Sequence, residues 1–196
     1  MTYLEFLSST TLSKRDLLAL SHGSCIDDPP SSQMGLLPAP PMLMLDRVVA
    51  ITHAGSRGSI VGEQDIDLDD WFFQCHFRSD PVQPGCLGVD AVWQLLAVYC
   101  MLRGAQGMCR ALGCKEVEFF GQIRPLDSVV RYEVEVRRYS EQKSTGTGVV
   151  VGNARVLVDG QHIYTIKDAK VGTFMGLRYD DYPKAARNGR GGVTER

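Results

Sequence analysis

One mainly apolar run, residues 86–102, constrains the fold of this chain more than any other feature. Pro84 and Gly85 precede the run and suit the first turn of a helix, and a glycine shortly after it suits the end. The run contains Asp90 and Gln94, so it is too short and too polar for a comfortable membrane span. Apolar side chains would point to every side of such a helix. The sequence therefore predicts a long helix that protein surrounds on most of its faces.

Most of the remaining chain is predicted to form strands. Apolar and polar residues alternate at 129–138, which is typical of a strand with one buried face. The pair Asp159-Gly160 is typical of a type I′ hairpin turn. Other strands are expected at residues 42–52, 59–65, 116–123, 153–158 and 161–167. Since a sheet can surround a helix only by curving, we expect an α+β fold with a curved, largely antiparallel sheet of about five to seven strands.

We expect different structures at the two ends of the chain. Ser13 and Asp16 are spaced as in a capping box, and they predict a short N-terminal helix that ends near Gly23. A loop rich in proline and serine follows as far as residue 41. Residues 175–196 show no periodicity and are expected to be a loose tail. We find no internal repeat, so residues 1–174 are expected to form one domain.

Charge and cysteine content argue against several classes of protein. A net charge of −2 and a pI of about 6.1 give no electrostatic reason to expect nucleic acid or an anionic membrane as the main partner. Residues 1–9 carry no Lys or Arg ahead of their apolar residues, so they do not resemble a secretory signal, and a cytoplasmic location is expected. The six cysteines follow no disulfide framework and are expected to be free thiols.

Two residues indicate acid–base chemistry. His76 offers a neutral imidazole near pH 7, which suits a general base. Asp90 lies among apolar helix residues, where a carboxyl group resists ionisation and is able to donate a proton. The alternatives are structural: a histidine that backbone groups satisfy, and an aspartate that the helix dipole keeps charged.

Three further residues would complete a candidate site. Gln94 follows Asp90 by one helical turn, so both side chains share one side of the helix and Gln94 can hold the carboxyl group. Gly85 and Cys86 provide unpaired amide hydrogens at the helix start, which suit a thioester oxygen that gains negative charge. Together these groups supply the base, the acid and the donors that dehydration of a 3-hydroxyacyl thioester requires. A purely structural Gln–Asp contact and an ordinary helix-entry glycine are the alternatives.

Two rival site chemistries have weaker support. Zinc is disfavoured because the candidate ligands form no paired Cys-x-x-Cys knuckles; these ligands are Cys75, His76, Cys86, Cys109 and Cys114. A cysteine nucleophile, Cys75 or Cys86 beside His76, is not excluded by the sequence. In that mechanism, however, Asp90 would have no role.

Three long motifs resemble the β-hydroxydecanoyl-acyl carrier protein dehydratases, the dehydratase/isomerases of bacterial fatty acid synthesis. The motifs are LPAPPMLMLDRV at 37–48, WFFQCHF at 71–77 and DPVQPGCLGVDAVWQL at 80–95, and the resemblance spans roughly residues 37–174. It implies a hot-dog fold, a homodimer, and no metal or organic cofactor. By position, His76 and Asp90 match the family's catalytic pair, and Gly85 matches its carbonyl-binding glycine.

The chain departs from this family at Gln83, where methionine is usual, and at residues 124–128. We expect these changes to alter the mouth of the pocket, and with it the acyl length. The resemblance implies dehydration of 3-hydroxyacyl groups on acyl carrier protein to trans-2-enoyl products, in fatty acid or polyketide-type biosynthesis. Isomerisation from trans-2 to cis-3 is the family's second activity. A hot-dog thioesterase and a non-catalytic acyl-binding subunit are the alternatives.

Two expectations concern partners. An acidic carrier protein would be steered by local basic residues, for which the candidates are Arg137, Arg138, Lys143, Lys167 and Lys170; an ordinary solvated surface is the alternative. We also expect the site to be shared across a dimer, with His76 of one chain facing Asp90 of the other. The resemblance implies this arrangement, and a single curved sheet leaves edge strands that a two-fold partner can cover.

Overall fold

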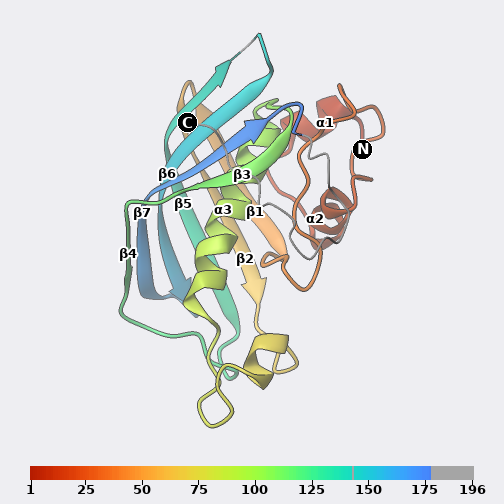
Figure 1. Ribbon diagram of the computed structural model, residues 1–196. Helices are drawn as coiled ribbons and strands as arrows, with labels where there is room; N and C mark the ends of the chain where they lie inside the picture. The colour runs from red at the N-terminus through yellow and green to blue at the C-terminus, as the bar shows by residue number, and fades with distance from the viewer. Residues whose placement is uncertain (143, 178–196) are drawn as a thin grey trace, which may run out of the picture.

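The computed structural model describes residues 1–142 and 144–177 of the chain (Figure 1). Its helices are α1 (Tyr3–Ser8), α2 (Lys14–Ser21) and α3 (Gly85–Leu102), together with a 3-10 turn, η1 (Trp71–Gln74). Its strands are β1 (Arg47–Ala54), β2 (Arg57–Asp65), β3 (Met108–Gly113), β4 (Glu116–Phe119), β5 (Val129–Gln142), β6 (Thr147–Val158) and β7 (Gln161–Phe174). Most of the predicted tail, from residue 178 onward, lies outside the described residues.

The strands within the described ranges form one antiparallel sheet in the order β1-β2-β5-β6-β7-β3. β4 pairs with the first part of β7, and β3 pairs with its last part. Alternate residues of β5 are buried, namely Val130, Tyr132, Val134 and Val136. This pattern confirms the prediction of a strand with one face toward the core.

Helix α3 lies across the sheet and contacts β2, β5, β6 and β7 (Figure 1). By length and composition it is apolar enough to cross a membrane, so the sequence argument that it is too short and too polar for a span was too strong. Burial accounts for its composition, because 78% of the helix is buried inside the protein. A curved antiparallel sheet around a long central helix is the hot-dog fold, which confirms the predicted α+β architecture.

Besides the 3-10 turn η1, one helix and one strand were not predicted. Helix α1 begins at a capping box in which Thr2 and Glu5 bond each other's backbone amides. Strand β3 lies between Gly107 and Gly113, which both have positive φ angles and which look like loop residues in the sequence. Helix α2 was predicted correctly, and its reciprocal Ser13–Asp16 capping contacts are present.

Three strands run further than the alternating pattern predicted. β5 continues beyond residue 138, β6 begins before residue 153, and β7 continues beyond residue 167. The pairing register shifts between Val136 and Arg138 on β5, and opposite Gly152 to Ala154 of β6 it shifts between Ile166 and Ala169 on β7. A β-bulge places an extra residue in one strand and reverses the alternation beyond it. Periodicity in the sequence therefore stops at the bulges of β5 and β7, although the strands do not. β6 alternates throughout, but two of its inward residues before residue 153 are glycines, Gly148 and Gly152, so no apolar pattern marks its start.

Strand β1 begins at Arg47, five residues later than predicted. The backbone of Met42 and Met44 is bonded to a side chain of α3 and not to a neighbouring strand. The prediction of a hairpin turn at residues 159–160 was correct. Asp159 and Gly160 have φ angles of 47° and 84°, as a type I′ turn requires, and they join β6 to β7.

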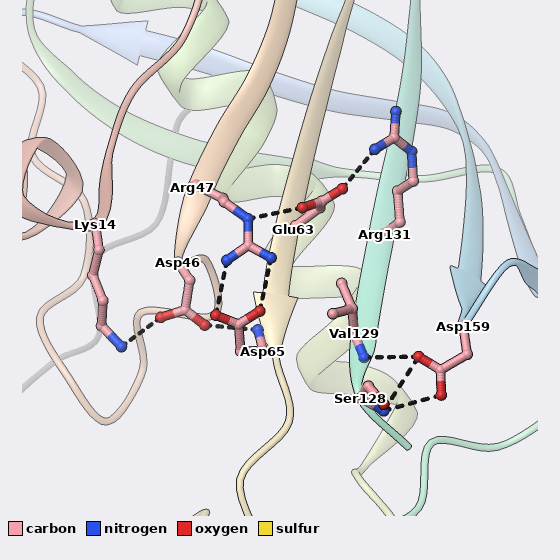
Figure 2. A network of polar contacts seen from close by, with 9 residues as sticks. All are labelled: Lys14, Asp46, Arg47, Glu63, Asp65, Ser128, Val129, Arg131 and Asp159. Carbon is pink, nitrogen blue, oxygen red and sulfur yellow. Dashed lines mark hydrogen bonds and ion pairs between the residues drawn. The ribbon is translucent and has the colours of Figure 1, made fainter.

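A network of ion pairs ties α2 to the ends of β1, β2 and β5 (Figure 2). Arg47 donates two hydrogen bonds to Asp65, of 2.8 and 2.7 Å, and one of 2.8 Å to Glu63. The network continues from Glu63 to Arg131 at 2.6 Å, and Asp46 bonds Lys14 at 2.6 Å and the Asp65 amide at 2.8 Å. It therefore fixes the end of β2, from which the chain runs on to η1.

Beside this network, a separate set of contacts holds the start of β5 (Figure 2). The carboxylate of Asp159 accepts hydrogen bonds from the amides of Ser128 and Val129. The β6–β7 turn is thereby anchored to the strand next to it.

Candidate active site

Asp90 lies on the second turn of α3 and is half-buried. The amide Nε2 of Gln94, one turn further along, donates a 2.6 Å hydrogen bond to Asp90 Oδ2. The contact predicted from the four-residue spacing is therefore present. The other carboxyl oxygen, Oδ1, makes no hydrogen bond within residues 1–142 and 144–177.

Both the nitrogen and the oxygen of the Gln94 side-chain amide form hydrogen bonds. Besides Asp90, Nε2 donates to the carbonyl oxygen of Met42 at 2.7 Å, and Oε1 accepts from the amide of Met44 at 3.0 Å. The Gln94 side chain is only 4% exposed, so these bonds form away from bulk water. Gln94 therefore fixes the segment around Met42 to the helix and holds the Asp90 carboxyl group in one orientation.

A pocket of about 260 Å³ opens beside Asp90. Its walls come from α3, from residues 36–42 and from β3, and they include Leu36, Pro38, Trp93 and Arg110. Most of the lining is apolar, and Asp90 and Arg110 are its charged members. The pocket therefore presents a carboxyl group at the wall of a largely apolar space.

His76 follows η1 in a short closed loop. Its amide donates to Phe72 O at 2.8 Å, and its carbonyl accepts from the amide of Val82 at 2.8 Å. The ring atom Nδ1 lies 3.0 Å from the carbonyl oxygen of Val82. Because a carbonyl oxygen only accepts, Nδ1 carries the hydrogen in this contact, and in the neutral ring Nε2 is then the nitrogen with the lone pair. The ring is half-buried, with the tautomer that a base acting through Nε2 requires.

The structure does not bring His76 and Asp90 together within one chain. His76 is absent from the wall of the Asp90 pocket, and no hydrogen bond joins the two side chains among the described residues. Each group is instead held separately, one by a backbone carbonyl and the other by Gln94.

Gly85 and Cys86 form the first turn of α3, as predicted. Pro84 precedes the helix as N-cap and no side chain caps it, so the amides of Gly85 and Cys86 keep the free donors that a helix start has, while the amide of Leu87 donates to the Pro84 carbonyl at 3.0 Å. A Cβ atom on Gly85 would lie 2.7 Å from the ring of Phe119 on β4. The Phe119 ring therefore packs directly on the glycine, and a larger residue would displace this ring, which is 49% exposed; the sequence did not reveal this contact. Cys86 is exposed.

Gln83 does not lie at a pocket mouth, so that interpretation was wrong. Its side chain is 5% exposed and points into the core, where Nε2 lies 3.4 Å from Oε1 of Gln64. Tyr132 donates to the same oxygen at 3.0 Å, and burial raises the pKa of this tyrosine, which keeps it a donor. From the other divergent segment, Arg124 pairs with Asp80 on the His76 loop at 3.1 Å.

The rival chemistries find little support in this geometry. Among the residues that the structure covers, no three His, Cys, Asp or Glu side chains gather closely enough to hold a metal ion. Cys75 is exposed, and its Sγ lies 3.6 Å from the carbonyl oxygens of Trp71 and Phe72, with no bond to His76.

Two of the five basic residues suggested for carrier docking are engaged in ion pairs. Arg137 bonds Asp168, and Lys167 bonds Glu116. Lys143 lies outside the described residues.

Arg138 and Lys170 are the better candidates on this surface. Both side chains are exposed, and neither makes an ion pair within the described parts of the chain. Each is in register with Val151, on β5 and β7 to either side of β6. Residues paired directly across a sheet point to the same face, so the two cations lie on one outer surface.

Residues 37–167 match the model of the FabA-like domain, and this range includes His76, Gly85, Cys86, Asp90 and Gln94. Among solved structures, the chain is similar to the dehydratase heterocomplex ApeI:P from Xenorhabdus doucetiae, with 13% identity, a TM-score of 0.48, and 69% of this chain and 85% of that chain covered. It is also similar to the E. coli PaaI protein from the phenylacetic acid degradation operon, with 13% identity, a TM-score of 0.48, and 83% and 96% covered.

Proposed function

Since this chain belongs to the FabA-like domain family, we propose that it is a dehydratase of 3-hydroxyacyl groups carried on acyl carrier protein. The observation that carries the proposal is Asp90, which Gln94 holds by one oxygen while the other oxygen remains available to an apolar pocket. A carboxyl group so held is suited to give a proton to a leaving hydroxyl group.

In the proposed reaction, Nε2 of His76 removes a proton from the carbon next to the thioester carbonyl. The bond between carbon 3 and its hydroxyl oxygen breaks as Asp90 protonates that oxygen, and water leaves. A trans double bond forms between carbons 2 and 3. The amides of Gly85 and Cys86 bind the carbonyl oxygen while it carries negative charge. The Val82 carbonyl supports this role for His76, because it orients the ring and favours the neutral tautomer whose Nε2 can accept a proton.

The acid and the base are proposed to come from different subunits of a homodimer. Two observations support this. His76 and Asp90 do not share a pocket within one chain, although the reaction needs both groups at one substrate. The sheet also ends in edge strands, β1 and β3, that a two-fold partner can cover.

The first experiment is direct. Purified protein is incubated with 3-hydroxyacyl carrier proteins of four to twelve carbons, and the products are separated by chromatography. Formation of trans-2-enoyl products is the expected result, and cis-3 products would reveal the isomerase activity. Inertness toward the whole series would refute the dehydratase. Release of free carrier thiol would instead identify a thioesterase, and acyl binding without turnover a non-catalytic subunit.

The shared site is tested by mixing two inactive variants. His76→Ala and Asp90→Asn chains are refolded together, and random pairing gives about half mixed dimers, each with one intact site. Recovery of roughly a quarter of wild-type activity is expected. A verified heterodimer without activity would mean that both groups act within one chain. His53→Ala, an exposed histidine on β1, and Cys75→Ala, beside His76, are the matched controls and should stay active.

A further inference from the structure

We propose that a second pocket, formed by the N-terminal segment of the chain, binds the far end of the acyl group. This inference rests on the proposed function, because it assumes a thioester substrate at Asp90. The pocket has a volume of about 820 Å³ and lies between α2, residues 23–36 and β3. The family resemblance does not predict it, and it determines which substrates fit.

The two pockets are adjacent. Leu36 and Arg110 line both the Asp90 pocket and the N-terminal pocket. At about 260 Å³ the Asp90 pocket is smaller than most ligand sites, which range from about 300 to 1,000 Å³. A substrate whose reacting carbons lie beside Asp90 therefore extends past Leu36, and the larger pocket is the space next to it.

The lining of the N-terminal pocket suits a hydrocarbon chain. Leu20, Ile26, Met34 and Met108 contribute apolar surface, and Arg110 is the one charged residue in its wall. The Arg110 guanidinium donates to the carbonyl oxygen of Cys109 at 2.8 Å. An anionic ligand could pair only with this arginine, which already bonds a backbone carbonyl. Burial of an apolar chain instead raises affinity about fourfold for each methylene group.

The walls of this pocket are held in place. Gln33 accepts the amide of Gly107 at 2.7 Å through its backbone, and the amide of Gly176 at 2.8 Å through its side chain. Gly35 packs so closely that an added Cβ would lie 2.9 Å from Sδ of Met101 and 3.0 Å from Sγ of Cys109. The N-terminal loop is thus attached to α3, β3 and the end of β7, and the pocket is largely formed before a ligand binds.

The test is the dependence of affinity on chain length. Saturated acyl thioesters of four, eight and twelve carbons, which cannot be dehydrated, are titrated by calorimetry into the full-length protein. We expect the twelve-carbon compound to bind at least about 100-fold more tightly than the four-carbon compound. Leu36→Trp, at the junction of the pockets, should reduce this ratio at least about tenfold. Leu36 is 40% exposed, so the larger side chain can be accommodated without unfolding the core.

Leu4→Trp on α1 is the matched control, because Leu4 is 76% exposed and lines neither pocket. If Leu36→Trp proves unfolded by circular dichroism, Ser32→Trp, in the wall of the N-terminal pocket, replaces it. Equal affinity for all lengths, or an equal loss for all lengths in the variant, would overturn the inference. Dehydration without length dependence refutes only the pocket. Length-dependent binding without dehydration refutes only the proposed enzyme.

Discussion

Replacement of Gly88 by alanine should destabilise the protein, and a second substitution should restore it. Gly88 lies on α3 between the candidate carbonyl-binding turn and Asp90, with Tyr164 of β7 directly against it. A Cβ atom at this position would lie 1.6 Å from the Tyr164 hydroxyl oxygen and 2.8 Å from the ring carbon that carries it. The helix approaches β7 this closely because residue 88 has no side chain.

The magnitude follows from these distances. An alanine needs about 3.4 Å of separation, so the hydroxyl group of Tyr164 would have to move by nearly 2 Å in a packed core. Overpacking of this kind costs about 3 kcal/mol, and the better helix propensity of alanine returns about 1 kcal/mol. Gly88→Ala should therefore lower the free energy of unfolding by about 2 kcal/mol.

Tyr164→Phe removes the obstructing oxygen. The Tyr164 hydroxyl is buried and has no hydrogen-bond partner among the described residues, so its loss alone should be neutral or stabilising. With phenylalanine present, Gly88→Ala has to displace the ring by only about 0.6 Å, and we expect its net effect to be close to zero. The two substitutions should therefore show a coupling energy of about 2 kcal/mol.

Urea denaturation of the wild type, both single variants and the double variant measures this coupling. Tyr139→Phe combined with Gly88→Ala is the control pair. Tyr139 packs against Gly148 and not against Gly88, so the free-energy changes of these two substitutions should be additive. Additive effects for Gly88 and Tyr164, or a stabilising Gly88→Ala, would show that the helix and β7 are not held at this distance by the glycine.

Gln94→Leu should lower kcat with a smaller effect on KM, because Asp90 loses its positioning contact, as steady-state kinetics would measure. It should also reduce stability by about 1–3 kcal/mol in urea denaturation, because the buried Met44 amide and the partly buried Met42 carbonyl lose their partner. The Arg47 hydrogen bonds lower the pKa of Asp65, so the stability that Asp65 contributes is present above its unfolded pKa and is lost as the pH falls below about 4. Arg47→Met should therefore make stability depend less on pH in this range, and unchanged acid denaturation would contradict this. Arg138→Glu with Lys170→Glu should raise KM for carrier-linked substrate only, and an equal rise with a small thioester analogue would argue against a docking surface.

Features set by local spacing were predictable from the sequence, and features set by packing between distant segments were not. The four-residue spacing of Asp90 and Gln94 predicted their contact, and apolar residues on all sides of α3 predicted its burial. The contact of Gly85 with Phe119 joins residues far apart in the chain, and no local pattern signals it. The direction of Gln83 likewise depends on Gln64 across the core, so its departure from the family pattern was misread as a change at the mouth of the pocket.

The bulge in β5 determines which residues beyond it point into the core. Arg137 is the extra residue: Val136 pairs with Gly152, and Arg138 pairs with the very next residue of β6, Val151. If β5 kept all of its residues and alternated strictly, without the bulge, Arg138 would point toward the core and Tyr139 toward solvent. Because of the bulge, Tyr139 is buried and Arg138 is exposed. Deletion of Arg137 would therefore remove the bulge and still leave Arg138 exposed and Tyr139 buried, because Arg138 would then follow Val136 in regular pairing with β6.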